Sequence, residues 1–299
     1  MKSLFLLLFL TNAHAISLKE IKLKLQKRLN VTSNKHSFGE ESPTTVGILD
    51  TGHASSVREF RDIASTKKAV DIDGHGSHVT GIILALNSNI TAFSERYDHK
   101  SFFNFNSYTK ALKRLIKKQP KIINISSGGF VKNQKEYELI KNNPKILFIV
   151  SAGNHSQNID KKYYTFFPAS YNDLPNIISV ANFKDKKTLA FSSNYGSSVL
   201  VGTIGTDVPS FDQHGELRIL SGTSQAAPII TASVATLMSR YPGITFKQIR
   251  HILKINSFKR KETNYGFFGV TSFNLWLNNH HTMADLNNEP PKYPGLVSN

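Results

Sequence analysis

The sequence contains no cysteine, and this absence excludes several kinds of protein. Without a thiol there is no disulfide framework, no thiolate metal site and no cysteine nucleophile. Acidic residues are also few, with 21 Asp and Glu against 37 Lys and Arg, which leaves a formal net charge of +16. No apolar run approaches the roughly 20 residues that a membrane-spanning helix needs. The hydrophobic fraction of 39% over 299 residues is still enough to bury a substantial core.

The N-terminus is typical of a secretory signal peptide. Lys2 precedes an apolar run over residues 4–10, and Ala13 and Ala15 form an A-x-A cleavage pattern. A buried N-terminal helix is the alternative interpretation of the same run. We expect residues 1–15 to be removed, and the mature protein to be exported as a secreted or periplasmic protein.

The next segment, residues 16–43, is predicted to be a helix followed by a linker. Apolar residues recur at spacings of three and four over residues 16–30, which predicts an amphipathic helix with a basic outer face. We expect this helix to dock on the main domain rather than to lie on a membrane surface. Residues 31–43 are polar, and residues 277–299 form a tail rich in Asn, His and Pro. This leaves one domain over residues 44–276, which we expect to be a monomer.

Within that domain, short apolar runs alternate with helical patterns. The runs are β-branched and continuous, as is typical of strands that are buried on both faces. They span residues 46–50, 122–126, 146–150 and 177–181, and the helical patterns span residues 75–87, 106–119, 133–142, 223–240 and 245–256. Strands separated by helices predict an α/β fold, in which helices cover both faces of a mostly parallel sheet.

Three short motifs carry groups with chemical reactivity. A D-T-G motif ends the first predicted strand with Asp50, at the place where open α/β sheets locate their sites. His75 lies between two glycines at a helix start, and small residues surround Ser224 at another helix start. Taken singly, each has an ordinary structural interpretation. Together they supply a hydroxyl nucleophile, a base that can take its proton, and a carboxylate that can orient the base.

The order Asp50, His75, Ser224 resembles that of the subtilases, the subtilisin-like serine peptidases. The family patterns D-T/S-G, G-H-G-T-H-V-A-G and G-T-S-M-A-S-P match residues 50–52, 74–81 and 222–228, and the exchanges leave the reacting groups unchanged. The resemblance covers about residues 45–256. It implies a subtilisin-like three-layer architecture and a secreted serine endopeptidase whose catalytic residues are Asp50, His75 and Ser224.

The same resemblance assigns further parts of the site. The S-A-G-N segment at residues 151–154 is similar to the A-A-G-N segment of the family, which implies that Asn154 is an oxyanion-hole donor. Residues 125–129 are similar to the strand and turn that pair with the substrate backbone. The likeness thus implies a protein or peptide substrate and substrate-binding roles for Ser126, Ser127, Gly128, Ala152 and Gly153.

Other functions account for less of the sequence. The D-T-G motif is also the signature of aspartic peptidases, but these enzymes need two carboxylates, and no second such motif occurs. A zinc site at His75 and His78 lacks the H-E-x-x-H spacing. A subtilase-fold binding or inhibitory module without catalysis is the alternative from a different class, although such a module typically lacks a member of the triad.

We expect neither a cofactor nor a nucleic-acid partner. Residues 86–90 resemble a calcium loop of the subtilases, but few acidic residues surround them, so a turn after a helix is the better interpretation and we expect no metal. The basic residues within 110–121 fall mainly on the outer face of a predicted helix. Because no aromatic-flanked basic motif accompanies them, we interpret this face as simply solvated.

Overall fold

The computed structural model describes residues 16–31, 42–66, 69–97, 105–259 and 266–268. The predicted signal peptide, most of the predicted linker and the predicted tail lie outside the described residues.

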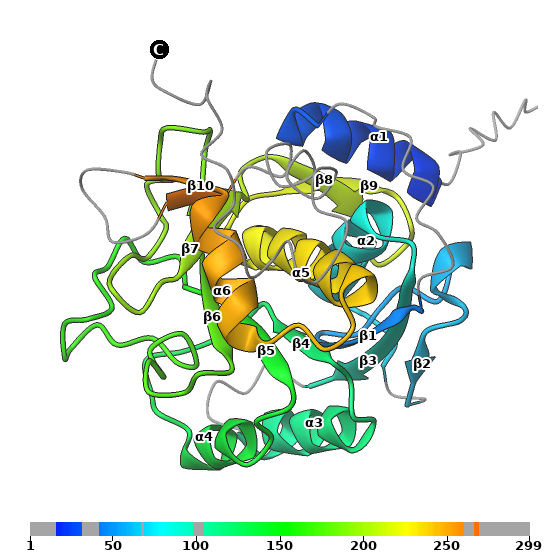
Figure 1. Cartoon of the computed structure of the whole chain (residues 1–299). Helices are drawn as coiled ribbons and strands as arrows, with labels where there is room; N and C mark the ends of the chain where they lie inside the picture. The colour runs from blue at the N-terminus through cyan, green and yellow to red at the C-terminus, as the bar shows by residue number, and fades with distance from the viewer. Residues whose placement is uncertain (1–15, 32–41, 67–68, 98–104, 260–265, 269–299) are drawn as a thin grey trace, which may run out of the picture.

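In the described part of the chain, nine strands form one twisted sheet at the centre of the molecule (Figure 1). They are β1 (Thr44–Asp50), β2 (Ala64–Ser65), β3 (Ile90–Arg96), β4 (Ile122–Ile125), β5 (Leu147–Ser151), β6 (Ile177–Phe183), β7 (Val201–Ile204), β10 (Ser257–Lys259) and β11 (Gly266–Phe268). Their order in the sheet is β10-β11-β7-β6-β5-β4-β1-β3-β2. Neighbouring strands are parallel except for the antiparallel pair β10–β11. A separate antiparallel hairpin joins β8 (Val208–Phe211) to β9 (Leu217–Leu220).

Helices lie on both faces of the sheet (Figure 1). On one face are α2 (His75–Leu86), α5 (Thr223–Arg240) and α6 (Phe246–Ile255), with α1 (Leu18–Leu29) packed outside α2 and β8. On the other face are α3 (Phe105–Lys117) and α4 (Gln134–Lys141), and a short 3-10 helix, η1 (Arg58–Phe60), precedes β2. The α/β architecture that the sequence predicts is confirmed. None of the described helices is long and apolar enough to cross a membrane.

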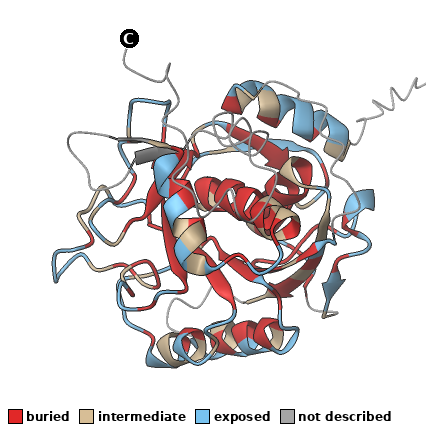
Figure 2. Ribbon diagram, viewed as in Figure 1, coloured by how far each residue is buried: buried red, intermediate tan, exposed pale blue. Residues whose placement is uncertain are grey.

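The central strands are buried on both faces, as their continuous apolar runs predict (Figure 2). On β5, Phe148 and Val150 belong to one core cluster, whereas Leu147 and Ile149, which point to the opposite face of the sheet, belong to another. All four side chains are fully buried. Because successive side chains of a strand point to opposite faces, a strand between two helical layers must be apolar at every position.

The predicted helices are observed with ends shifted by at most two residues, whereas several strands were not predicted. The clearest case is β3, which pairs with β1 along its whole length. Its sequence is interrupted by Ser94 and Glu95, and both are buried. Arg114 on α3 donates from Nε to the Glu95 carboxylate at 2.6 Å, which compensates the buried charge.

Helix α1 is docked through one face, as its spacing predicts. Ile21, Leu25 and Leu29 are buried in the core cluster that includes residues of α2 and β8, whereas Leu23 is 56% exposed. At its C-terminal end, Arg28 donates from Nε to the carbonyl oxygen of Thr206 at 2.8 Å. The helix is therefore an integral part of the domain.

This docking predicts a large difference between two leucines of the same helix. Replacing the buried Leu25 by Ala should lower the free energy of unfolding by about 2–5 kcal/mol, because it removes packed methyl groups and leaves a cavity. The matched change Leu23→Ala should alter it by no more than about 0.5 kcal/mol. Urea titration of both variants measures the difference. Equal, small effects at the two positions would mean that α1 is not packed on the domain.

Candidate active site

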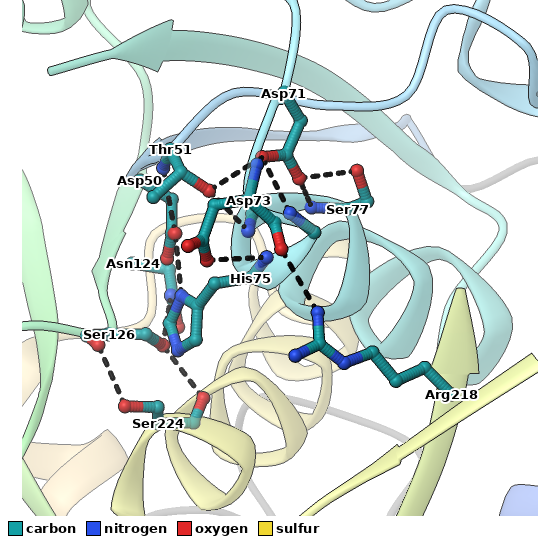
Figure 3. Close-up of polar contacts among 12 residues, drawn as sticks. Asp50, Thr51, Asp71, Asp73, His75, Ser77, Asn124, Ser126, Arg218 and Ser224 are labelled. Atoms are coloured by element: carbon teal, nitrogen blue, oxygen red, sulfur yellow. Dashed lines mark hydrogen bonds and ion pairs between the residues drawn. The ribbon is translucent and has the colours of Figure 1, made fainter. Parts of the chain in front are cut away.

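Segments far apart in the sequence meet at one edge of the sheet. Asp50 is the last residue of β1, and the segments that follow the neighbouring strands β4 and β5 begin at the same edge. The carboxyl ends of parallel strands share an edge, which is where α/β folds place their sites. His75 and Ser224 reach this edge from the N-terminal ends of α2 and α5 (Figure 3).

Asp50 and His75 form a directly bonded pair. Nδ1 of His75 lies 2.7 Å from Oδ1 of Asp50, which also accepts the backbone N–H of Thr51 at 2.8 Å. Asp50 is 1% exposed, and its other oxygen, Oδ2, has no hydrogen-bond partner within the described residues. A bond at Nδ1 leaves Nε2 of the His75 ring available on the opposite side.

The charges around His75 raise its pKa. Burial alone lowers the pKa of this imidazole, but the charge and hydrogen bond of Asp50 act in the opposite direction. The carboxylates of Asp73 and Asp71 raise it further, so that the pKa lies above its ordinary value of 6.5. The site therefore favours the protonated form of His75 more than water does.

Asp71 holds together the two segments that carry the pair. Its buried Oδ1 accepts bonds from Thr51 Oγ1 at 2.9 Å and from the backbone N–H groups of Asp73 and Gly74, both at 3.0 Å. Its Oδ2 accepts the backbone N–H of Ser77 at 2.8 Å and the hydroxyl of the same residue at 2.5 Å. Burial raises the pKa of Asp71, but these hydrogen bonds lower it more. The pKa of this carboxyl therefore lies below its ordinary value.

A glycine contact brings the start of α2 close to the end of β1. A Cβ atom on Gly76 would lie 2.1 Å from the carbonyl oxygen of Gly52, so any side chain at this position would push the segments apart. The backbone N–H of Gly76 instead donates to Thr51 Oγ1 at 2.8 Å. The glycines around His75 therefore allow the close approach on which the Asp50–His75 bond depends.

His78 faces away from this pair. Its Nε2 lies 3.0 Å from the carbonyl oxygen of Val208 and 3.2 Å from that of Arg218, both on the β8–β9 hairpin. Burial lowers the pKa of His78 to about 3, which keeps the ring neutral.

The segment that resembles a calcium loop, residues 86–90, includes the end of α2, where the Asn87 side chain donates to Thr236 Oγ1 at 3.0 Å. Among the described residues, no cluster of three His, Asp or Glu could hold a metal ion.

Ser224 is the second residue of α5 and is bonded to the segment after β4. Its Oγ donates to the carbonyl oxygen of Ser126 at 2.8 Å, and the Ser126 hydroxyl donates to the Ser224 carbonyl oxygen at 2.9 Å (Figure 3). Asn124 on β4 donates to the Ser126 hydroxyl at 3.0 Å. The Ser224 hydroxyl is thus held beside Ser126 rather than directed at His75. A hydrogen bond between a serine nucleophile and its histidine base is often long or misaligned in unliganded proteins.

Asn154 is oriented by the residue before Ser224. Its Oδ1 accepts the backbone N–H of Thr223 at 2.9 Å and the Thr223 hydroxyl at 3.1 Å. Its Nδ2 and the backbone N–H of Ser224 have no acceptor within the described part of the chain. Two N–H donors, one of them held by Thr223 at the start of α5 and the other the main chain of Ser224, are therefore without an acceptor in the described residues.

The expected substrate-binding residues divide into two groups. The backbone groups of Ala152 and Gly153 are already used, because Asn194 binds both of their carbonyl oxygens and Gly153 N–H donates to Thr223 Oγ1. Ser127 and Gly128 make no main-chain hydrogen bond within the described residues. Of these two groups, the segment after β4 is therefore the one whose main chain stays unpaired in the part of the chain that the structure describes.

Several residues that organise the site received no role from the sequence. Thr51, Ser77 and Thr223 lie inside the motifs, so their presence was visible but their bonding was not. Asp71 and Asn194 lie outside the matched patterns. The signal that could have identified Asp71 is its place just before the second motif, in a segment that needs a buried acceptor.

Comparisons with known proteins agree with this arrangement. A family model described as the subtilase family matches residues 41–272. The chain is 30% identical over 236 residues to the thermostable alkaline protease of Halalkalibacterium halodurans, covering 73% of this chain and 62% of the relative. It is 25% identical over 233 residues to the cell wall-associated protease of Bacillus subtilis, covering 71% of this chain and 25% of the relative. The chain thus spans only part of the length of these relatives.

A solved structure shows the same fold. The crystal structure of a cold adapted subtilisin-like serine proteinase superposes with a TM-score of 0.67 at 20% sequence identity, covering 86% of this chain and 98% of that one. The family model covers most of the chain, including every segment that meets at the edge of the sheet. The chain belongs to the subtilase family.

Proposed function

We propose that this protein is a serine endopeptidase that cleaves peptide bonds through an acyl-enzyme intermediate. The observation that carries the proposal is the bonded pair of Asp50 and His75 at the same sheet edge as Ser224, whose own N–H has no acceptor within the described residues. The subtilase family consists of serine proteases, which is consistent with this chemistry. Peptides and proteins are therefore the proposed substrates.

The first step uses His75 as a base. Rotation about the Cα–Cβ bond of Ser224 releases its hydroxyl from the Ser126 carbonyl oxygen and directs it to Nε2 of His75. As Oγ forms a bond to the substrate carbonyl carbon, its proton passes to Nε2, and Asp50 stabilises the resulting imidazolium through Nδ1. The negative charge moves to the carbonyl oxygen, where Asn154 Nδ2 and Ser224 N–H donate to it.

The second step breaks the peptide bond and restores the enzyme. When the carbonyl reforms, the C–N bond breaks, and Nε2 of His75 gives its proton to the leaving amine. A water molecule then attacks the ester, again losing a proton to His75. This proton returns to Ser224 Oγ as the C–O bond of the ester breaks, which releases the carboxylic acid.

The substrate backbone is placed by the free edge at Ser127 and Gly128. An extended peptide that lies beside this segment adds a strand and gains main-chain hydrogen bonds without regard to its side chains.

We further propose that the protein is exported, on the basis of the signal-peptide pattern in residues 1–15. Protein recovered outside the cytoplasm should then begin at Ile16, and a retained Met1 would contradict this.

Labelling with a fluorophosphonate probe tests the nucleophile. The wild-type protein should be labelled at Ser224 only, and Ser224→Ala should abolish both labelling and peptide hydrolysis. Ser221→Ala is the matched control, because this hydroxyl lies on the same loop but accepts the backbone N–H of Asp207 at 2.9 Å. A folded protein that is not labelled would favour the alternative of a binding or inhibitory module without catalysis.

Replacement of Asn154 by Ala tests the oxyanion donor. A donor that acts mainly on the developing charge should affect kcat rather than KM. We expect kcat to fall by about 10²–10³, a magnitude measured on subtilisin itself, with little change in KM. Asn158→Ala is the control, since this side chain binds the backbone N–H of Asp160 at 3.0 Å in the same loop. A loss of stability with kcat per titrated active site unchanged would make Asn154 merely structural.

The charges around His75 predict the pH dependence. Because the neutral ring is the base and its pKa is raised, kcat/KM should increase with pH through a pKa above 6.5. Asp73→Asn removes one of the charges that raise this pKa, so the acidic limb should move to lower pH. The amide retains Oδ1, which accepts the backbone N–H of His75 at 3.3 Å. Glu138→Gln, on α4, should leave the profile unchanged, and a shift to higher pH in Asp73→Asn would contradict the assignment.

A further inference from the structure

An aromatic ring occupies the space between the two segments that flank Ser224. Phe166 lies in the long connection from β5 to β6 and is 5% exposed. A Cβ atom on Gly128 would lie 2.4 Å from Cε1 of this ring, and a Cβ atom on Gly153 would lie 2.9 Å from the same carbon. Side chains at both glycines would thus point at one atom. The edge of the Phe166 ring is wedged between the segment after β4 and the segment after β5.

The ring is held in this place from several sides. It packs against Phe130 at a centroid distance of 5.6 Å and against His155 at 5.5 Å. The backbone N–H of Phe166 donates to Ser170 Oγ at 3.0 Å, and its carbonyl oxygen accepts Ser170 N–H at 2.8 Å. The next residue, Phe167, exchanges two main-chain hydrogen bonds with Gly129 at 2.8 and 2.9 Å. The ring is therefore part of the packed structure and is not free to swing out at low cost.

The position of the reacting carbonyl determines which part of a substrate meets this ring. The carbonyl carbon must lie beside Ser224 Oγ, its oxygen must point at Asn154 Nδ2, and its backbone must follow Ser127 and Gly128. The side chain of the residue that supplies this carbonyl, the P1 residue, branches from the Cα atom bonded to the carbonyl carbon. It must therefore enter between the segment that contains Gly128 and the segment that ends at Asn154, which is the space that Phe166 already occupies.

We propose that Phe166 restricts the P1 residue of the substrate to a small side chain, that of Gly, Ala or Ser. The inference rests on the proposed function, because it assumes attack by Ser224 on a peptide carbonyl. The two facing glycines leave a gap between the segments, and the edge of the Phe166 ring fills that gap. A Leu or Phe side chain at P1 would have to displace a buried ring that has packing partners on several sides. Specificity is thus set by one aromatic side chain and not by a charged group.

A peptide series with wild-type protein gives the first test. Peptides that differ only at P1, with Ala, Ser, Leu or Phe, are compared by kcat/KM. Differences in side-chain size at a tightly packed site change kcat/KM by about 10–200-fold, so Ala and Ser should exceed Leu and Phe by at least about tenfold. A preference for Leu or Phe would overturn the proposal. The fluorophosphonate label at Ser224 separates the two levels, because a labelled enzyme that prefers large P1 residues retains the proposed function and loses only this inference.

Variants at Phe166 give the second test. Phe166→Ala should raise kcat/KM for the Leu peptide relative to the Ala peptide by at least about tenfold, reversing the discrimination expected of a filled site. Phe166→Leu retains more of the core packing and should give a smaller change in the same direction, which keeps the test available if the Ala variant does not fold. Phe105→Ala, at the exposed start of α3, is the control and should leave the ratio unchanged. Unchanged ratios in a folded Phe166 variant would overturn the proposal. If the wild-type protein is not labelled at Ser224, both this proposal and the proposed function are wrong.

Discussion

The hydrogen bonds to the buried carboxylate of Asp71 are the interaction on which the rest of the site depends. A buried charge is costly unless its oxygens are fully bonded, and here donors come from the segment after β1, from the loop before α2 and from the first turn of that helix. The positions of Asp50 and His75 are therefore not independent, since each lies next to a donor of the same acceptor. Loss of this acceptor would leave several buried N–H and O–H groups without partners and separate β1 from α2.

The electrostatic arrangement follows from the same segments. The pair of Asp50 and His75 lies at the boundary between core and solvent, with the carboxylate inside and the side chain of His75 27% exposed. Low exposure on the acidic side strengthens the attraction between the two groups, whereas exposure on the other side gives the ring access to a substrate. The neutral His78, only one turn further along α2, shows how strongly burial without a carboxylate partner changes the same side chain.

The sequence predicted the helices and the central strands well, because their apolar periodicity is a local property. It did not predict β3, because Ser94 and Glu95 are tolerated there only through contacts with residues such as Arg114, which the sequence does not place nearby. The motifs predicted Asp50, His75 and Ser224 as catalytic residues, and the structure brings the segments that carry them to one edge of the sheet. Neither the bond from Ser224 to Ser126 nor the position of Phe166 could be predicted, because both depend on segments that meet only in the folded chain.

The docking of α1 has a consequence for the order in which the molecule forms. This helix is synthesised early, yet its partners include β8, and its Arg28 binds the carbonyl oxygens of Thr206 and Lys184, which lie 178 and 156 positions later in the chain. An amphipathic helix of 12 residues has little stability alone, so its apolar face stays uncovered until most of the chain has been made. Contacts between such distant residues slow folding, because a long loop must close before they contribute. We therefore expect α1 to pack against the domain late in folding. Most of the domain must be synthesised before the partners of α1 are present.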